Sequence, residues 1–372
     1  GSGRVGGDGV MAKLGEVCLL KAGKFVSAND ISPEYNKGLY PCFGGNGIRG
    51  YVADYTHDGE FPLIGRQGAL CGNVNLASGK FHATEHAVVV QPKIEMNVHW
   101  LYYALNAMNL GQYATGAAQP GLAVSKLETL SIEIPNISEQ NKIAQTLYKV
   151  EQLVNFRKQQ LAKLDELVKA RFVEMFGDPV RNEKGWNTYA LAEMCDGIGD
   201  GLHGTPEYDE NGEYPFINGN NLIDGVIQIN ASTKKVNKKT YEKHYIKISQ
   251  NAILLSINGT LGKIAFYNGE QVMLGKSACY CNLKDEVNRI FVYKIMKTDA
   301  FAGYLEDNST KSTIKNVGLK AIREYRLIAP PLSLQNQFAV FAEYVDQQKQ
   351  TVQQSLEKLE LMKKALMQEY FG

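Results

Sequence analysis

Two short motifs and a set of six histidines contain residue types that can carry catalytic chemistry. Phe43-Gly44-Gly45-Asn46-Gly47 fits the Phe-x-Gly-x-Gly loop with which methyltransferases hold their cofactor, but no Asn/Asp-Pro-Pro-Tyr/Phe motif accompanies it. The segment from Gly269 to Ser277 ends in Gly-Lys-Ser, but its leading glycine is one residue too early for a phosphate-binding loop. The six histidines form no HExxH motif and no Ser-His-Asp order. We therefore expect a binding protein without catalytic or metal-ligating residues.

A second group of residues has the chemistry needed to recognise nucleic acid. Arg and Lys form paired hydrogen bonds with guanine, and Asn and Gln do so with adenine, while glycine lets the backbone come close to a phosphate. In the first half of the chain, such side chains lie in glycine-rich stretches, and the alternative is that they only solvate turns. The candidates are Asn46, Arg49, Arg66, Gln67, Asn73 and Gln119.

The second half of the chain carries a larger candidate set, with lysines for phosphates and Asn, Thr and His for bases. A lysine run is by itself more often a solvated face, so these residues gain weight only if the halves are related. The clustered lysines are Lys234, Lys235, Lys238, Lys239, Lys243 and Lys247. The other candidates are His203, Thr205, Asn218, Asn220, Asn221, Asn258, Lys263, Lys276, Lys311, Thr313 and Lys315.

The elements that must position these residues are duplicated along the chain. Residues 138–177 and 333–372 are identical at 15 of 40 positions, at an offset of 195 without a gap. This period is too long for a solenoid repeat, so it indicates a duplicated domain-plus-helix unit. The globular parts repeat more faintly: the segment 64–74 resembles 255–264, and both regions show the short runs of strand-forming residues typical of a mixed α+β fold.

Each repeat ends in a stretch whose apolar residues step by three and four, which predicts a helix of about 58 Å at 1.5 Å per residue. Ser138 is the expected N-cap of the first helix and Gly177 its C-cap. Arg157 and Arg171 interrupt one apolar stripe, and Lys349 and Lys363 interrupt the other, each opposite apolar residues. We therefore expect the helices to pair with each other rather than lie separately on their own domains. The stripe residues are Ile143, Leu147, Val150, Val154, Leu161, Leu164, Val168, Phe338, Val345, Val352, Leu356, Leu359 and Leu366.

The pattern gives a division of the chain, and its composition sets further bounds. We expect a cloning remnant at 1–10 with the natural start at Met11, a globular domain at 11–137, a long helix at 138–177, a second globular domain at 178–332 and a second long helix at 333–372. A net charge of +1 requires any nucleic-acid surface to be local. The six cysteines form no CxxC motif, so reduced thiols are expected, and no apolar run approaches the length of a membrane span.

The order globular–helix–globular–helix resembles the specificity subunit of a type I restriction-modification system over essentially the whole chain from Met11. The resemblance depends on the Pro-x-x-x-x-Gln-x-x-Ile/Phe-Ala motif before each long helix (Pro135 to Ala144; Pro330 to Ala339) and on the Gly-Thr-x-Gly-Lys loop at 259–263. The first domain departs from the loop pattern, because its loop at 68–72 has one extra residue and no lysine.

The resemblance implies a mixed α+β fold with two target-recognition domains and two long antiparallel coiled-coil helices, related by an internal pseudo-two-fold repeat. Each domain would read one half of a bipartite DNA target, and the helices would fix the spacing and dock two modification subunits. Restriction subunits would join for cleavage and phage defence. The chain itself would hold no cofactor, with S-adenosylmethionine and ATP bound only by partner subunits, and it would act in the cytoplasm.

Three other functions stay open at the level of sequence. One is the recognition subunit of a related bipartite system with fused methyltransferase-nuclease partners, which the sequence cannot separate from the first. Another is a standalone enzyme on a duplicated α/β fold. The third is a purely structural coiled-coil adaptor, although most of the chain lies outside the predicted helices.

Overall fold

The chain folds into two compact units, each built from a mixed α+β domain and parts of two long helices. The computed structural model describes residues 9–116 and 120–372. The helices are α4 (Ile137–Phe176) and α9 (Leu332–Phe371), each of 40 residues. The first unit contains the chain up to Gln159 together with Val352–Gly372, and the second contains Gln160–Thr351. Each helix therefore contributes residues to both units.

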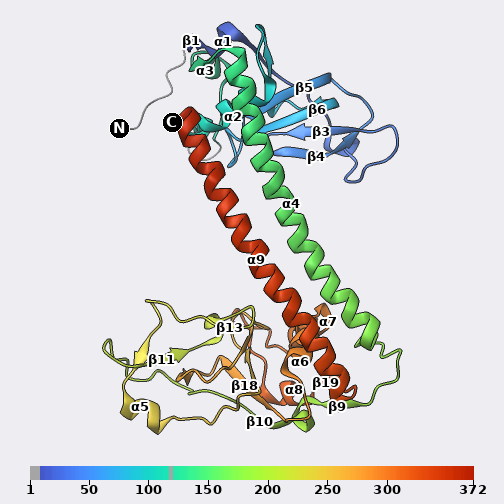
Figure 1. Ribbon diagram of the computed structural model, residues 1–372, viewed down its shortest axis with the longest axis vertical. Coiled ribbons are helices and arrows are strands. Elements are labelled where there is room, and N and C mark those ends of the chain that lie inside the picture. Colours follow the sequence, from blue (N-terminus) through green and yellow to red (C-terminus); the bar gives the residue numbers. More distant parts are fainter. Residues whose placement is uncertain (1–8, 117–119) are drawn as a thin grey trace. The chain divides into compact units, whose positions relative to one another are not determined.

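The first unit is organised around a sheet with the strand order β2-β7-β5-β6-β3-β4. Its strands β5, β6, β3 and β4 are labelled in Figure 1. The buried part of strand β7, Ala87 to Val90, is apolar at every position and does not alternate with polar residues, because both faces of the sheet are covered at this point. Helix α2 packs on the sheet through Trp100, Leu101 and Leu105. The elements are β1 (Val10–Lys13), α1 (Leu14–Val17), β2 (Cys18–Ala22), η1 (Ala28–Asp30), β3 (Tyr40–Gly44), β4 (Gly47–Val52), β5 (His57–Gly65), β6 (Val74–Ala83), β7 (Ala87–Pro92), α2 (Val98–Ala107), η2 (Leu110–Tyr113), α3 (Val124–Glu128) and β8 (Ser131–Ile134).

The second unit repeats this plan with shorter strands. Its main sheet has the order β10-β18-β15-β16, and smaller sheets pair β14-β11-β17, β12-β13 and β19-β9. The elements are β9 (Thr188–Ala190), η3 (Leu191–Met194), β10 (Cys195–Asp200), β11 (Tyr214–Ile217), η4 (Gly219–Asn221), β12 (Leu222–Ile223), β13 (Val226–Ile227), β14 (Lys235–Val236), α5 (Lys238–Lys243), β15 (Ala252–Ser256), β16 (Ile264–Phe266), β17 (Met273–Leu274), β18 (Ala278–Leu283), α6 (Arg289–Met296), α7 (Asp299–Asp307), α8 (Leu319–Glu324) and β19 (Arg326–Ile328).

The strand pairing confirms the predicted duplication. The antiparallel series β2-β7-β5 of the first unit corresponds to β10-β18-β15 of the second. In both units a short parallel pairing follows, between Phe43 and Ala83 in the first and between Ile217 and Leu274 in the second. An antiparallel strand pair then precedes each long helix, β1-β8 and β9-β19. The short runs of strand-forming residues in both regions do form strands, such as Ala87–Pro92 in the first unit and Ala252–Ser256 and Ile264–Phe266 in the second.

A buried glutamine joins each long helix to its domain. Gln140 is 2% exposed; its Oε1 accepts from the Asn97 backbone N–H at 2.9 Å, and its Nε2 donates to the Pro135 carbonyl at 2.8 Å. Asn97 in turn caps α2 by accepting from the Trp100 N–H. The Gln side chain therefore connects the helix start, the preceding strand and the helix that covers the sheet.

The second unit contains the same junction. Gln335 is also 2% exposed, accepts from the Asn288 N–H at 2.9 Å and donates to the Pro330 carbonyl at 2.7 Å. Asn288 caps α6 by accepting from the Phe291 N–H at 3.3 Å. The Pro-x-x-x-x-Gln motif is thus conserved between the two halves because the proline carbonyl and the glutamine amide are bonded to each other.

The two long helices pair antiparallel within each unit, as predicted. In the first unit Lys363 donates to Glu151 at 2.6 Å, and Arg157 donates to Ser355 at 3.2 Å. In the second unit Lys349 donates to Asp165 at 2.5 Å. The lysines that interrupt the apolar stripe of α9 are thus matched by carboxylates of α4, which compensates for placing an amine in the seam.

The predicted stripe residues are all buried or half-buried, but their partners are not only the other helix. Leu161, Leu164, Leu359 and Leu366 are half-buried, and the rest are buried. Ile143 and Leu147 also belong to the core of the first domain, and Val168, Phe338 and Val345 to that of the second. Leu366 packs against the first core. Helix pairing and packing on a domain are therefore combined, not alternatives.

One predicted helix boundary is wrong. The N-cap of α4 is Asn136 and not Ser138, since the Asn136 Oδ1 accepts from the Glu139 N–H at 3.0 Å and the helix already includes Ile137. Both Asn and Ser cap helices, and because the helix begins one residue earlier than predicted, the residue just before it is Asn136. At the other end, Gly177 has φ +76°, the left-handed conformation expected of a C-cap glycine. Strand β1 starts at Val10, inside the expected remnant. Among the described residues, no helix is long and apolar enough to cross a membrane.

The glutamine junction can be tested by substitution. We expect Gln335→Ala to lower the free energy of unfolding by about 1–3 kcal/mol, because the Asn288 N–H and the Pro330 carbonyl lose a buried partner. Gln337→Ala, two residues further on the exposed side of α9, is the matched control and should change it by less than about 0.5 kcal/mol. Denaturant unfolding, with hydrogen exchange at the Asn288 amide, measures both. Equal effects of the two substitutions would contradict the role of the junction.

Candidate nucleic-acid interface

The motifs that resemble catalytic loops have other structural roles. Residues 44–47 form the tight turn between the antiparallel strands β3 and β4, not a strand-to-helix loop. Gly275-Lys276-Ser277 likewise joins two strands, β17 and β18. A phosphate-binding loop needs the N-terminus of a helix, and neither segment leads into one. Within residues 9–116 and 120–372, no cluster of three or more His, Cys, Asp or Glu side chains could hold a metal ion.

In the first unit, separate turns converge on Gly45. A Cβ at this residue would lie 3.3 Å from the His86 carbonyl oxygen and 3.5 Å from that of Gln67. Arg66 donates its backbone N–H to the His86 carbonyl at 3.0 Å. We call the surface formed by the turns 44–47 and 84–87, the loop 65–73 and the segment 120–122 the first loop face. Glycine at position 45 permits this close approach.

The predicted candidates of the first unit lie on or beside this face. Gln67, Asn46 and Asn73 are exposed, and Arg66 is half-buried. The Asn73 side chain donates to the Asn46 side chain at 2.9 Å, which connects the loop to the turn. Arg49 is exposed, and its side chain lies against Gly44. Gln119 lies outside the described residues.

The second unit forms the same surface with different side chains. A Cβ at Gly219 would lie 3.1 Å from the Ser277 carbonyl oxygen and 2.7 Å from the Ser256 Cβ, as at Gly45. Ile257 donates its N–H to the Ser277 carbonyl at 3.1 Å, as Arg66 does to His86. The second loop face comprises the turns 218–221 and 275–278, the loop 256–263 and the segment 309–317.

The loop of the first unit closes like that of the second despite its extra residue. In the first, Gly72 donates to the Gly65 carbonyl at 2.7 Å; in the second, Gly262 donates to that of Ser256 at 3.0 Å. The bond from Gly68 to the Pro120 carbonyl corresponds to that from Gly259 to the Lys315 carbonyl. By this correspondence Gln67 and Asn258 occupy equivalent positions, and so do Asn46 and Asn220. Amide side chains thus recur at matching points of both faces.

The second loop face contains a concave site of about 450 Å³. Three predicted residues that are far apart in sequence line it: His203, Asn258 and Lys276. His203 Nε2 lies 2.7 Å from Asp200 Oδ2, and Asn258 donates to the Asn316 side chain at 3.1 Å. Asp200 and Asn316 are site residues that sequence reasoning missed, because no motif marks them.

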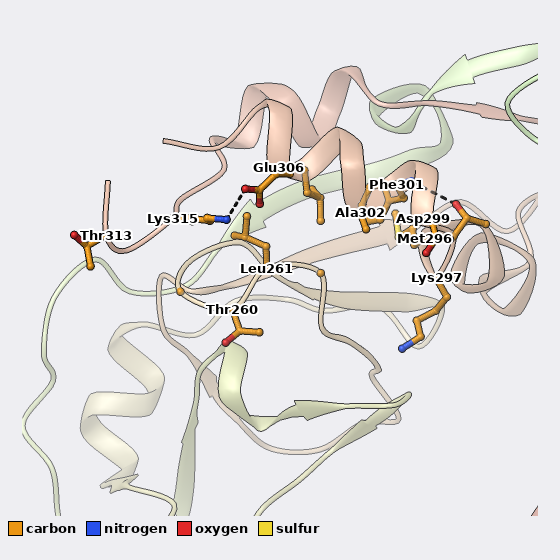
Figure 2. Close-up of a pocket in the computed structure, with 14 residues that line it drawn as sticks. Thr260, Leu261, Met296, Lys297, Asp299, Phe301, Ala302, Glu306, Thr313 and Lys315 are labelled. Atoms are coloured by element: carbon orange, nitrogen blue, oxygen red, sulfur yellow. Dashed lines mark hydrogen bonds and ion pairs between the residues drawn. The ribbon is translucent and has the colours of Figure 1, made fainter. Parts of the chain in front are cut away.

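A larger groove of about 590 Å³ is lined by the loop 259–262 (Figure 2). Its wall is formed by α7 and the segment before it, and Figure 2 shows Lys315 and Glu306 pointing toward one another at one end. The predicted residues Thr313 and Lys315 also line this groove. Lys315 forms an ion pair with Glu306, so its charge has a partner within the chain.

The lysine cluster forms an exposed basic surface on β14 and α5. Asn237 caps α5 by accepting from the Thr240 N–H at 2.9 Å, and the Tyr241 ring stacks on Tyr214 of β11 with centroids 4.0 Å apart. This packing fixes the short helix and directs its lysines to solvent. The predicted lysines Lys234, Lys235, Lys238, Lys239, Lys243 and Lys247 are all exposed.

The remaining candidates divide into exposed residues and residues with intrachain bonds. Asn218 accepts from the Ser277 hydroxyl, and Asn221 bonds the Asn218 N–H and the Gln228 carbonyl. These two side chains shape the turn. Lys263 is half-buried; Thr205, Asn220 and Lys311 are exposed.

The six cysteines are buried. Desolvation raises the pKa of Cys18 to about 11 and also raises the pKa values of Cys42 and Cys71 above their usual range. Within the part of the chain that the structure describes, the cysteines form no disulfide. The thiols of Cys18, Cys42 and Cys71 are therefore less readily ionised than an ordinary cysteine, which makes them poorer nucleophiles.

Comparison with known proteins identifies the family. The family described as type I restriction modification DNA specificity domain matches residues 8–166 and 183–361, which is one match in each half of the chain. The chain belongs to this family. The predicted architecture of a type I specificity protein, a mixed α+β fold with long helices and two DNA-specificity domains, is thereby confirmed.

Individual relatives agree with this assignment. The EcoprrI type I restriction enzyme specificity subunit of Escherichia coli is 52% identical over 149 residues, which is 40% of this chain but only 37% of that subunit. A putative type I specificity subunit of Haemophilus influenzae is 26% identical over 80% of this chain and 78% of its own length.

A solved structure shares the fold over nearly the whole chain. The S subunit of a type I restriction-modification system from M. genitalium superposes with a TM-score of 0.68 at 18% sequence identity and covers 99% of this chain and 97% of its own. At this identity the likeness concerns the fold and not the target of this specificity protein.

The close approach of loops in the specificity protein can be tested at Gly201. A Cβ there would lie 2.0 Å from the Leu274 carbonyl oxygen, a backbone atom, so we expect Gly201→Ala to lower the free energy of unfolding by roughly 1–3 kcal/mol. Gly303→Ala is the control: nothing lies within 4 Å of a Cβ on this residue of α7, and it should stabilise by about 0.5–1 kcal/mol. Chemical denaturation checks the opposite signs; a neutral Gly201→Ala would refute the close approach.

Proposed function

We propose that this chain is the non-catalytic DNA-specificity subunit of a type I restriction-modification complex, in which each globular domain reads one half of a bipartite DNA target. The observation that carries the proposal is the duplicated loop face. Several backbone bonds recur at equivalent places in both units, while some side chains at equivalent positions differ, such as Arg66 and Ile257, or His86 and Ser277. This is expected of two readers with different target sequences.

The side chains on these faces suit base recognition. Gln67 and Asn258 present amides, which pair with adenine in the major groove, and Lys276 presents an amine for guanine. The exposed lysines of β14 and α5 suit phosphates, which position a protein on DNA without reading its sequence.

The long helices support a role as spacer and docking element. Each contributes to the cores of both units, through Ile143 and Val168 in α4 and through Leu366 and Phe338 in α9. A helix pair is stiff, so it would hold the two half-sites at a constant separation, which DNA geometry places at a multiple of one helical turn, roughly 34 Å. Two modification subunits would dock on it, and restriction subunits would join for cleavage.

The proposal assigns the chemistry to other chains. S-adenosylmethionine and ATP would be bound by the modification and restriction subunits, and this chain would need neither. One solved structure that superposes with a TM-score of 0.54 comes from work on complex assembly of a type I system, which supports a partner-dependent role. We place the complex in the cytoplasm, where the DNA is. A recognition subunit for fused methyltransferase-nuclease partners is the alternative, and the partner genes distinguish the two.

The decisive experiment is genome-wide mapping of adenine methylation by single-molecule sequencing. A host expressing this chain with its modification subunit is compared with a host expressing the modification subunit alone. We expect a new motif of two short half-sites around a fixed gap. Unchanged methylation, with the assembled complex demonstrated, would overturn the proposal.

The basic surface can be tested by the salt dependence of DNA binding. We expect Lys234→Gln, Lys235→Gln and Lys239→Gln together to reduce the slope of log K against log salt by up to about 2.7, or roughly 0.9 for each lost phosphate contact. The methylated motif should stay the same. Lys320→Gln, an exposed lysine of α8 paired with Glu324, is the control. An unchanged slope in the triple variant would exclude the lysines from the interface.

A further inference from the structure

The turns at 84–87 and 275–278 are the same structural element in the two units. In the first, the Ala87 N–H donates to the Thr84 carbonyl at 3.0 Å; in the second, the Ala278 N–H donates to the Gly275 carbonyl at the same distance. Each turn is also bonded to the preceding parallel strand at the equivalent place, Thr84 to the Phe43 carbonyl and Gly275 to that of Ile217.

These matching bonds make Glu85 and Lys276 equivalent residues, so the same position of the turn carries a carboxylate on the first loop face and an amine on the second. Lys276 is exposed and lines the concave site with His203 and Asn258. The Glu85 side chain is 35% exposed. The next residue, His86, accepts a backbone hydrogen bond from Arg66, so Glu85 lies beside the segment that contains Arg66 and Gln67. No sequence motif marks Glu85. Its neighbours Thr84 and His86 can be matched to Gly275 and Ser277 only by their backbone hydrogen bonds.

The carboxylate of Glu85 is incompletely satisfied. Its Oε1 lies 3.2 Å from His86 Nε2, but its Oε2 is buried and has no hydrogen-bond partner within the described residues. A carboxylate oxygen without a donor is destabilised, so the side chain gains by turning toward one.

A carboxylate on a DNA-facing surface has a specific chemical meaning. Phosphates repel it, so it weakens binding unless a base supplies a donor. In the major groove that donor is the exocyclic amine of cytosine, which Glu and Asp accept from, whereas Lys donates to the O6 and N7 atoms of guanine.

We propose that position 85/276 is a specificity-determining position in both domains, with Glu85 accepting from a cytosine amine in the first half-site and Lys276 donating to a guanine in the second. This inference rests on the proposed function and deepens it. It names the base class that each domain reads at one matched position.

The experiment uses the full chain in complex with its modification subunit. Glu85→Gln and Glu85→Lys are compared with the unsubstituted chain by methylation mapping and by competition binding to duplexes that carry each base in turn at every cytosine of the first half-site. Glu85→Gln keeps the size of the side chain and removes its charge. Glu95→Gln is the matched control: this exposed glutamate lies beyond Pro92, past the end of β7 opposite the turn 84–87.

We expect Glu85→Gln to reduce discrimination at one cytosine of the first half-site by about 10- to 100-fold and to leave the second half-site unchanged. Glu85→Lys should shift that position toward guanine, and Lys276→Ala should relax one guanine of the second half-site only. The intact second half-site shows that a Glu85 variant has folded and assembled.

Other outcomes are equally informative. If the unsubstituted chain directs a bipartite motif and Glu85→Gln leaves every position unchanged, Glu85 is only an ion-pair partner of His86 and the inference is wrong. Relaxation at a position without cytosine would also overturn it. If the unsubstituted chain directs no motif, the proposed function fails first.

Discussion

The bond between a buried glutamine and the proline carbonyl five residues before it is the constraint on which the rest of this structure depends. Gln140 and Gln335 each satisfy the N–H of an N-cap asparagine, so one side chain fixes the start of a long helix, the preceding strand and the helix that covers the sheet. A second bond between Asn97 and Asn141, repeated between Asn288 and Asn336, fixes the same junction from outside. Because the amide is almost fully buried, an alternative geometry would leave polar groups without partners, and that penalty makes the direction of each helix relative to its own domain unique.

The scaffold and the recognition surface of each unit are held by different parts of the chain. Backbone hydrogen bonds between loops, together with glycines at contacts too close for a Cβ, define most of each face, and a few side-chain bonds such as Asn73 to Asn46 add to them. A position such as 85 or 276 can therefore change from carboxylate to amine while its turn stays the same. This separation of backbone frame from side-chain chemistry explains how one duplicated fold can serve two different half-sites.

The contact between α4 and α9 contains two charged residues whose role is in positioning the helices. Lys349 and Lys363 occupy seam positions that apolar residues would stabilise more, yet each has a carboxylate of α4 opposite. Asp165 is 57% exposed, so its pair with Lys349 adds little stability, whereas the Lys363–Glu151 pair is less exposed. They do set the register, since a slip by one turn would remove both partners at once, and a fixed register is what a spacer between two readers requires.

The sequence by itself determined the duplication, the two long helices with their seam residues, and the fold class, because these depend on periodic patterns and on identities such as Gln140 and Gln335 that survive at a fixed offset. It also predicted His203, Asn258 and Lys276 as DNA contacts, but as separate candidates with no indication that they lie close together. Only the tertiary structure brought these three into one concave site and showed that Asn218 and Asn221 are bonded within a turn. It also showed that Asn136 caps α4 and that Glu85 and Lys276 occupy equivalent positions in the two repeats. The physical reason is that strands and helices follow from local spacing, whereas the loops are fixed by hydrogen bonds between backbone atoms of distant residues, which no side-chain pattern encodes.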